Sequence, residues 1–109
     1  MSKVDFTSAV IAKDKVVSNN TVYSDELDIR TMIGIFLTSL ITTTASGETH
    51  IEITDADKSF WSLLDGSSKT ISTTTQYAVD LQRSSGAYLR QVVTLSGAGT
   101  FTTNINEKR

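Results

Sequence analysis

The sequence predicts an all-β protein: a single-domain antiparallel β-sandwich, jelly-roll-like, with six to eight short strands and at most one short helical turn. Three observations predict this class. A chain of 109 residues is the size of one domain. Ser and Thr make up 31 of these residues, and the β-branched Thr favours strands over helices. Short segments of alternating apolar and polar residues follow one another, separated by turn-forming residues.

The N-terminal segment has the pattern of extended chain. Residues 4–12 alternate, which indicates either a strand or an extended arm. The stretch to about Val17 is a candidate arm that reaches a neighbouring molecule, and simple fraying is the equal alternative. We therefore expect residues 1–17 to form an N-terminal arm or edge strand and residues 18–109 to form the β-sandwich domain. The segment 21–30 surrounds an acidic cluster with apolar residues and predicts one strand with a bulge or two short strands.

Residues 32–44 form the strongest predicted strand. The segment is rich in β-branched residues and contains Gly34, and both features favour a strand over a helix. Apolar residues occupy both of its faces, which is typical of a central strand that is covered on both sides. One predicted face carries Ile33, Ile35, Leu37 and Ile41, and the other carries Met32 and Phe36.

The middle of the chain changes its period. In residues 49–54, alternation places Ile51 and Ile53 inside the sandwich and the neighbouring His50 and Glu52 outside. In residues 55–65, by contrast, the apolar side chains follow the spacing of one helical face. We expect a short helical turn there, capped by Asp57 or Ser59.

The C-terminal third predicts more strands. A short polar strand covers residues 70–75, and in residues 75–82 the side chains of Tyr77, Val79 and Leu81 face inward. After a turn at Ser84-Ser85-Gly86, residues 88–109 predict a closing hairpin. Its inner face carries Leu89, Val93, Leu95, Phe101 and Ile105, and its outer face carries Arg90, Thr94, Thr100, Thr102 and Asn104.

Composition excludes several classes of function. The formal net charge of −2 and the scattered basic residues argue against a nucleic-acid partner. No apolar run reaches the length of a membrane span, and no signal peptide is visible, so no membrane partner is expected. The absence of cysteine excludes disulfides and thiolate metal sites, which fits synthesis in a reducing cytoplasm.

The sequence offers little reactive chemistry. His50 is the only histidine, and its place in an alternating strand indicates an exposed strand residue. Asp55 and Asp57 resemble the start of a calcium loop, but Phe60 and Gly66 stand where that loop requires Gly and Glu. Turn acidity is the favoured interpretation. We therefore expect no enzyme, with no catalytic, cofactor-binding or metal-ligating residues and no cofactor.

The aromatic residues allow two interpretations. Phe60-Trp61, Tyr77 and Tyr88 suit a sugar-stacking platform on a β-sandwich, or Trp61 caps the open end of the hydrophobic core. The core interpretation is favoured, and a role of some of these rings in an interface is compatible with both.

Several short motifs follow one another in a characteristic order over roughly residues 20–108. They are Leu27-Asp28-Ile29, Ser46-Gly47, the stretch 55–61, Tyr88-Leu89-Arg90 and the stretch 97–108. In this order and spacing the chain resembles the small β-sandwich virion proteins of tailed bacteriophages, of the capsid cement or decoration type. It departs from the commoner pattern in its short length and its lack of proline.

The resemblance implies a non-enzymatic structural protein of a bacteriophage virion, on the capsid surface. Its implied role is that of a capsid cement or decoration protein with a jelly-roll-like fold, which binds the major capsid protein and itself, as a homotrimer. The alternative is a tail, spike or fibre module that recognises a host surface carbohydrate. The residues expected at its interfaces are Phe6, Trp61, Arg90, Thr94 and Thr102.

Overall fold

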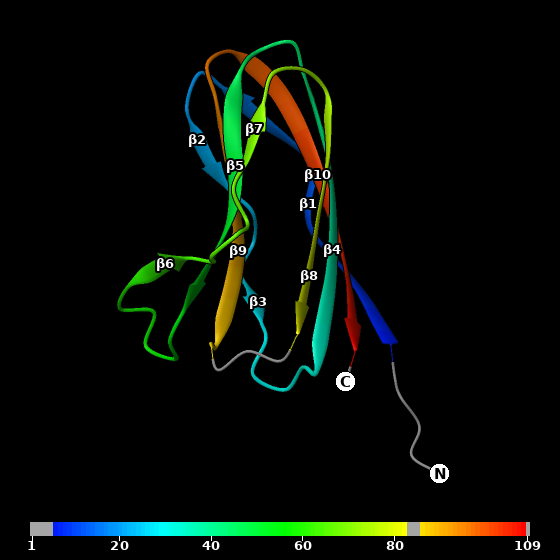
Figure 1. Ribbon diagram of the computed structural model, residues 1–109, viewed down its shortest axis with the longest axis vertical. Helices are drawn as coiled ribbons and strands as arrows, with labels where there is room; N and C mark the ends of the chain where they lie inside the picture. The colour runs from blue at the N-terminus through cyan, green and yellow to red at the C-terminus, as the bar shows by residue number, and fades with distance from the viewer. Residues whose placement is uncertain (1–5, 83–85, 109) are drawn as a thin grey trace.

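The computed structural model describes residues 6–82 and 86–108, and the regular structure of these residues is entirely β-strand (Figure 1). The all-β class is confirmed. The predicted turn at Ser84-Ser85 and the first residues of the predicted N-terminal strand lie outside the described residues. The strands of the described part are β1 (Phe6–Ser18), β2 (Thr21–Tyr23), β3 (Leu27–Asp28), β4 (Gly34–Thr43), β5 (Gly47–Thr54), β6 (Trp61–Leu63), β7 (Lys69–Ile71), β8 (Thr75–Gln82), β9 (Tyr88–Leu95) and β10 (Ala98–Lys108).

Two antiparallel sheets pack face to face. Sheet A has the order β1-β10-β4-β8; sheet B has the order β2-β9-β5-β6, with β3 also paired to β9 and β7 also paired to β5. When β2 with β3, and β6 with β7, are each counted as one interrupted strand, the sandwich has eight strands. They pair in nested order, first with last and inward from there, so the fold is a jelly roll.

The strand β1 lies at the edge of sheet A and follows β10 along its length, from Phe6 opposite Lys108 to Ser18 opposite Ala98. Its register shifts between Val10 and Lys15, and Asp14 there has a φ of 45°. Such bulges twist an edge strand and make it a poorer template for pairing with another chain.

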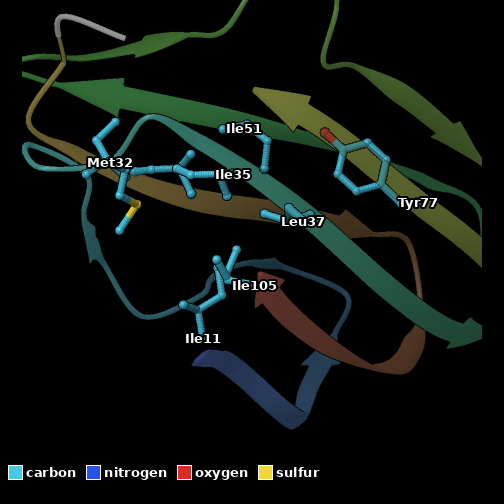
Figure 2. Close-up of a cluster of buried hydrophobic side chains, with 9 residues drawn as sticks. Ile11, Met32, Ile35, Leu37, Ile51, Tyr77 and Ile105 are labelled. Atoms are coloured by element: carbon cyan, nitrogen blue, oxygen red, sulfur yellow. The ribbon is translucent and has the colours of Figure 1, made fainter. Parts of the chain in front are cut away.

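The apolar core lies between the sheets in two clusters. Figure 2 shows the first cluster, to which strands of both sheets contribute side chains, and the second lies nearer the turns that follow β1 and β9. The inner face predicted for the closing hairpin is confirmed. Its members are at most 2% exposed: Leu89, Val93, Leu95, Phe101 and Ile105.

A belt of polar side chains separates the two clusters. The Nε2 atom of Gln91 donates to Ser39 Oγ and Thr49 Oγ1, each at 3.1 Å. The hydroxyl of Thr103 contacts Gln91 Oε1 and lies 2.8 Å from Ser39 Oγ. All four side chains are buried, and Gln91 is 0% exposed. The belt is stable because its polar groups satisfy one another where water is excluded.

The helical turn predicted in residues 55–65 is wrong. Trp61–Leu63 is the strand β6, which pairs with Glu52–Thr54 of β5. A single helical turn leaves most of its backbone groups unpaired, whereas the edge of β5 offers hydrogen-bond partners. Before β6 the chain forms a turn in which Asp55 Oδ1 accepts a hydrogen bond from the backbone of Ser59.

The faces predicted around the central strand need correction. β4 does lie between β10 and β8, but its alternation begins only at Gly34. Met32 therefore enters the core at 6% exposure, while Ile33 is 47% exposed. Phe36, on the outer face of β4, is 48% exposed, so the prediction of a strand covered on both sides is also wrong within this chain.

Tyr77 gives the fold a dependence on alkaline pH. Its side chain is 5% exposed, and its hydroxyl donates to the Ser67 carbonyl at 2.6 Å. Burial raises the pKa of Tyr77 from 10.0 to about 12. The folded state thus favours the neutral phenol, so this stabilisation is complete below pH 10 and is lost as the pH rises towards 12.

We expect the free energy of unfolding of the wild type to fall by about 2 kcal/mol more than that of Tyr77→Phe between pH 10 and pH 12. Urea denaturation at several pH values measures this difference. Parallel pH profiles for the two proteins would contradict it.

Candidate functional site

The outer face of sheet B is organised around Arg90. The carbon Cζ of its guanidinium lies 4.0 Å from the ring centroid of Tyr23 and 4.1 Å from that of Trp61. These rings come from β2 on one side of β9 and from β6 on the other. Nε and Nη2 of Arg90 both bond Oε1 of Glu52, the residue opposite it on β5, at 2.9 and 2.7 Å. We call Tyr23, Glu52, Trp61 and Arg90 the arginine cluster.

A row of polar side chains continues from the arginine cluster along β5. Nε2 of His50 lies 3.2 Å from Oε2 of Glu52, and Nδ1 lies 3.0 Å from Oε1 of Glu48. His50 thus connects the two carboxylates, with one ring nitrogen beside each of them. The outward direction predicted for His50 is confirmed, but its side chain is only 18% exposed because it lies between two carboxylates.

Tyr88 forms a second aromatic centre on this face. Nζ of Lys58 lies 4.5 Å from its ring centroid, and Cζ of Arg30 lies 5.2 Å from it. A hydrogen bond to Glu26 raises the pKa of Lys58, and one to Asp28 raises the pKa of Arg30. Both cations therefore remain charged beside the ring.

The two centres differ in rigidity. The Arg90 and Glu52 side chains are 18% and 19% exposed, and two rings hold the guanidinium in place. The Arg30–Asp28 pair is about half exposed, so solvent screens it and it contributes little to stability. The arginine cluster is thus a preformed surface: its contacts hold the guanidinium in one geometry, and Tyr23 remains 44% exposed.

A projecting loop adjoins the arginine cluster. Phe60, which precedes β6, is 82% exposed, and Leu63 is 54% exposed. In Figure 1 the β6 hairpin extends away from the body of the sandwich. A depression of about 440 Å³ lies beside it, lined among others by Ile53, Phe60 and Leu64. Exposed apolar side chains beside a rigid arginine and aromatic rings form a surface typical of protein interfaces.

The structure brings together only some of the residues predicted at interfaces. Trp61 and Arg90 contact each other, and Thr94 lies on the same face, hydrogen-bonded to Thr21 at 2.8 Å. Thr102 lies on sheet A, where its hydroxyl contacts Asp14. For Phe6 the structure describes only the backbone, which lies in β1.

The favoured interpretation of Trp61 as a cap of the core is wrong. Its ring lies on the outer face of sheet B against Arg90, outside both core clusters. Among Phe60, Trp61, Tyr77 and Tyr88, it is Tyr77 whose ring is buried in the core. Sequence reasoning missed Tyr23 altogether. In the sequence, only the position of Tyr23 at the end of an alternating segment pointed to this residue. The pairing of β2 with β9 is what places it beside Arg90.

The described residues contain no cluster of three or more histidine or carboxylate side chains placed to hold a metal ion. Asp55 accepts a backbone hydrogen bond within its own turn. No helix long and apolar enough to cross a bilayer occurs in the part of the chain that the structure describes.

Comparison with known proteins gives likenesses of fold. No family model and no curated protein matches the chain. Among solved structures, it is similar to the SPBc2 prophage-derived protein YomS, with a TM-score of 0.63 and 17% identity over 100% of this chain and 97% of that one. It is also similar to the protein of T=1 particles derived from infectious bursal virus, with a TM-score of 0.61 and 9% identity. That likeness covers 97% of this chain but only 31% of the viral chain.

A third similar structure is that of Bacillus endospore appendages, described as disulfide-linked pili, with a TM-score of 0.58 and 8% identity over 97% of this chain and 89% of that one. At these identities the likenesses concern the fold alone. They place the chain among jelly-roll-like sandwiches that occur in a prophage-derived protein, a viral particle and a pilus.

Proposed function

We propose that the chain is a non-enzymatic structural protein of a bacteriophage virion, namely a capsid cement or decoration protein that binds the major capsid protein and stabilises the shell. The observation that carries this proposal is the arginine cluster on the outer face of a jelly roll. The fold likeness to a prophage-derived protein and to the protein of a viral particle supports a structural role in a virion.

The arginine cluster suits the binding of a protein surface. Arg, Trp and Tyr are the residues that most often dominate the energy of protein interfaces. Here Arg90 is already paired and stacked, so little side-chain entropy is lost when a partner docks on it. We assign the contact with the shell to this cluster together with the exposed Phe60.

The rest of the surface suits repeated weak contacts. Ser and Thr make up 31 of the 109 residues, and hydroxyl groups form hydrogen bonds without burying an unpaired charge. Each such bond contributes about 1 kcal/mol, and a symmetric shell multiplies it through avidity. Binding between copies is part of this proposal. The resemblance implies three copies, and the mass of the assembly in solution tests that number.

The composition of purified virions tests the proposal. We expect the chain in the head fraction, in at least as many copies as an icosahedral shell has equivalent positions, measured by quantitative mass spectrometry of separated heads and tails. Heads that lack the chain should break at a lower temperature than heads that carry it. Its absence from heads, or its presence in only a handful of copies, would contradict the proposal.

Recognition of a host carbohydrate is the second candidate, because Trp61 and Tyr23 present rings on an outer face. Arg90 occupies one face of the Trp61 ring, which leaves less of it for stacking against a sugar. This candidate predicts glycan-array binding that is lost in Trp61→Ala, together with a low copy number in tails. Absence of glycan binding by the wild type on the array would count against this candidate.

A further inference from the structure

The outer face of sheet A, opposite to the arginine cluster, is apolar and almost uncharged at its centre. Val10, Phe36 and Leu40 are 55%, 48% and 46% exposed there. The side chains around them are mostly hydroxyls and amides, and charged groups lie towards the two edge strands. Asp80 and Lys69 lie towards β8, and Asp14 lies at β1, where it contacts the Thr102 hydroxyl. Depletion of charge at the centre of an exposed apolar face is typical of an interface.

The register of sheet A arranges this face in rows that cross the strands. The middle row runs Val10, Asn104, Thr38, Ala78. On one side of it lies the Phe36 row, which is Ser8, Asn106, Phe36, Asp80. On the other side lies the Leu40 row, which is Thr102, Leu40, Gln76.

The two outer rows are complementary to each other. If a second copy is turned by 180° about a line along the middle row, each Phe36 row faces a Leu40 row. Phe36 then meets Leu40, an apolar pair. Asn106 meets Thr102 and the adjacent Asp14, so its amide faces a hydroxyl and a carboxylate. Asp80 meets Gln76, whose backbone carbonyl accepts a hydrogen bond from Lys69 Nζ at 3.3 Å, so a carboxylate faces a side-chain amide and a cation.

The surface shape of the outer face of sheet A is compatible with the same 180° rotation. A depression of about 860 Å³ lies over the Leu40 row and the middle row, lined among others by Leu40, Gln76 and Ala78. The rotation places Phe36 of the second copy over this depression. Because Ala78 and Thr38 in the middle row are small, the two sheets can approach to the usual spacing of about 10 Å.

We propose that the outer face of sheet A pairs two copies of the chain about a two-fold axis along the row Val10, Asn104, Thr38, Ala78. A two-fold interface requires one patch to be complementary to itself, which the exchange of the Phe36 and Leu40 rows provides. This inference does not depend on the virion proposal, since it concerns the free protein. It also differs from the trimer that the sequence resemblance implies.

Cysteine substitutions test the axis, because the chain contains no cysteine of its own. Stacked sheets are too far apart for a disulfide, so a thiol crosslinker that spans about 8 Å is used. Thr38→Cys lies on the axis, and we expect it to crosslink to its own copy. Asn106→Cys and Thr102→Cys lie about 14 Å apart along the strand direction. We expect neither to crosslink alone and a mixture of the two to give the dimer.

Sedimentation measures the same pairing without a reagent. We expect Leu40→Asp, which places a carboxylate against Phe36 of the other copy, to raise the dimer dissociation constant at least tenfold. Thr94→Asp on sheet B is the matched control and should leave it unchanged. Circular dichroism checks that both variants are folded. A wild type that is monomeric or trimeric at all concentrations would overturn the proposal. Crosslinking of Asn106→Cys alone as efficient as that of the mixture would overturn it too.

Discussion

Arg90→Ala is expected to weaken binding of the protein to its shell by about 100-fold, which corresponds to about 2.7 kcal/mol. The substitution removes the centre of the arginine cluster. Tyr23 and Trp61 lose the group that fixes their rings, and Glu52 remains as a poorly paired carboxylate on the surface that must be desolvated. Co-sedimentation of the purified protein with shells that lack it measures the change.

Loss of stability must be separated from loss of binding in this experiment, because Arg90 is only 18% exposed. Phe60→Ser provides the separation, since Phe60 is 82% exposed and we expect its replacement to leave the fold intact. We expect it to weaken shell binding about tenfold at unchanged unfolding free energy. Val16→Ser, at a 67% exposed position of sheet A, is the matched control and should bind as the wild type does. Equal binding of all three variants would contradict the assignment of this face.

Gln91→Ala is expected to lower the free energy of unfolding by about 3 to 4 kcal/mol. The substitution opens a cavity between the two core clusters and removes the amide that Ser39, Thr49 and Thr103 contact. Thr49 still donates to the Val92 carbonyl at 2.8 Å, so most of the lost hydrogen-bond energy is that of the contacts of Ser39 and Thr103 with Gln91. Urea denaturation followed by circular dichroism measures it, with the exposed Gln76→Ala as a control that changes stability by less than about 0.5 kcal/mol.

Replacement of the belt by apolar groups distinguishes its two contributions. Gln91→Leu fills the cavity but leaves hydroxyls without their amide partner, and should cost about 2 kcal/mol. Combined with Ser39→Ala and Thr103→Val it removes those hydroxyls as well, and most of the loss should be recovered. A triple variant less stable than Gln91→Leu would show that the belt stabilises the core in its own right, and would contradict this explanation.

Local patterns predicted most of the fold because alternation survives wherever one face of a strand is buried. The closing hairpin shows this, since both faces assigned to Leu89–Leu95 are correct in β9. Errors arose where a pattern was short. The helical spacing of Phe60, Leu63 and Leu64 covers little more than one turn, and pairing with β5 decided the outcome. Met32 and Ile33 were misplaced because alternation cannot show where a strand begins.

The candidate site was harder to predict because its members meet through strand register. Alternation correctly placed His50, Glu52 and Arg90 on outer faces, but it carries no information about which strands are neighbours. Tyr23 and Trp61 reach Arg90 from opposite sides, through the pairing of β2 with β9 and of β6 with β5. The composition did not identify the site either, because aromatic residues occur both in cores and at interfaces.

A cryo-EM map of the virion heads tests the central claim most directly, because it shows both the number of copies and the face that each copy presents. We expect density for the jelly roll at every equivalent position on the capsid surface, with the arginine cluster on the outer face of sheet B and the projecting loop with Phe60 against the major capsid protein. Density confined to the tail, or a head lattice without any copy, would contradict it.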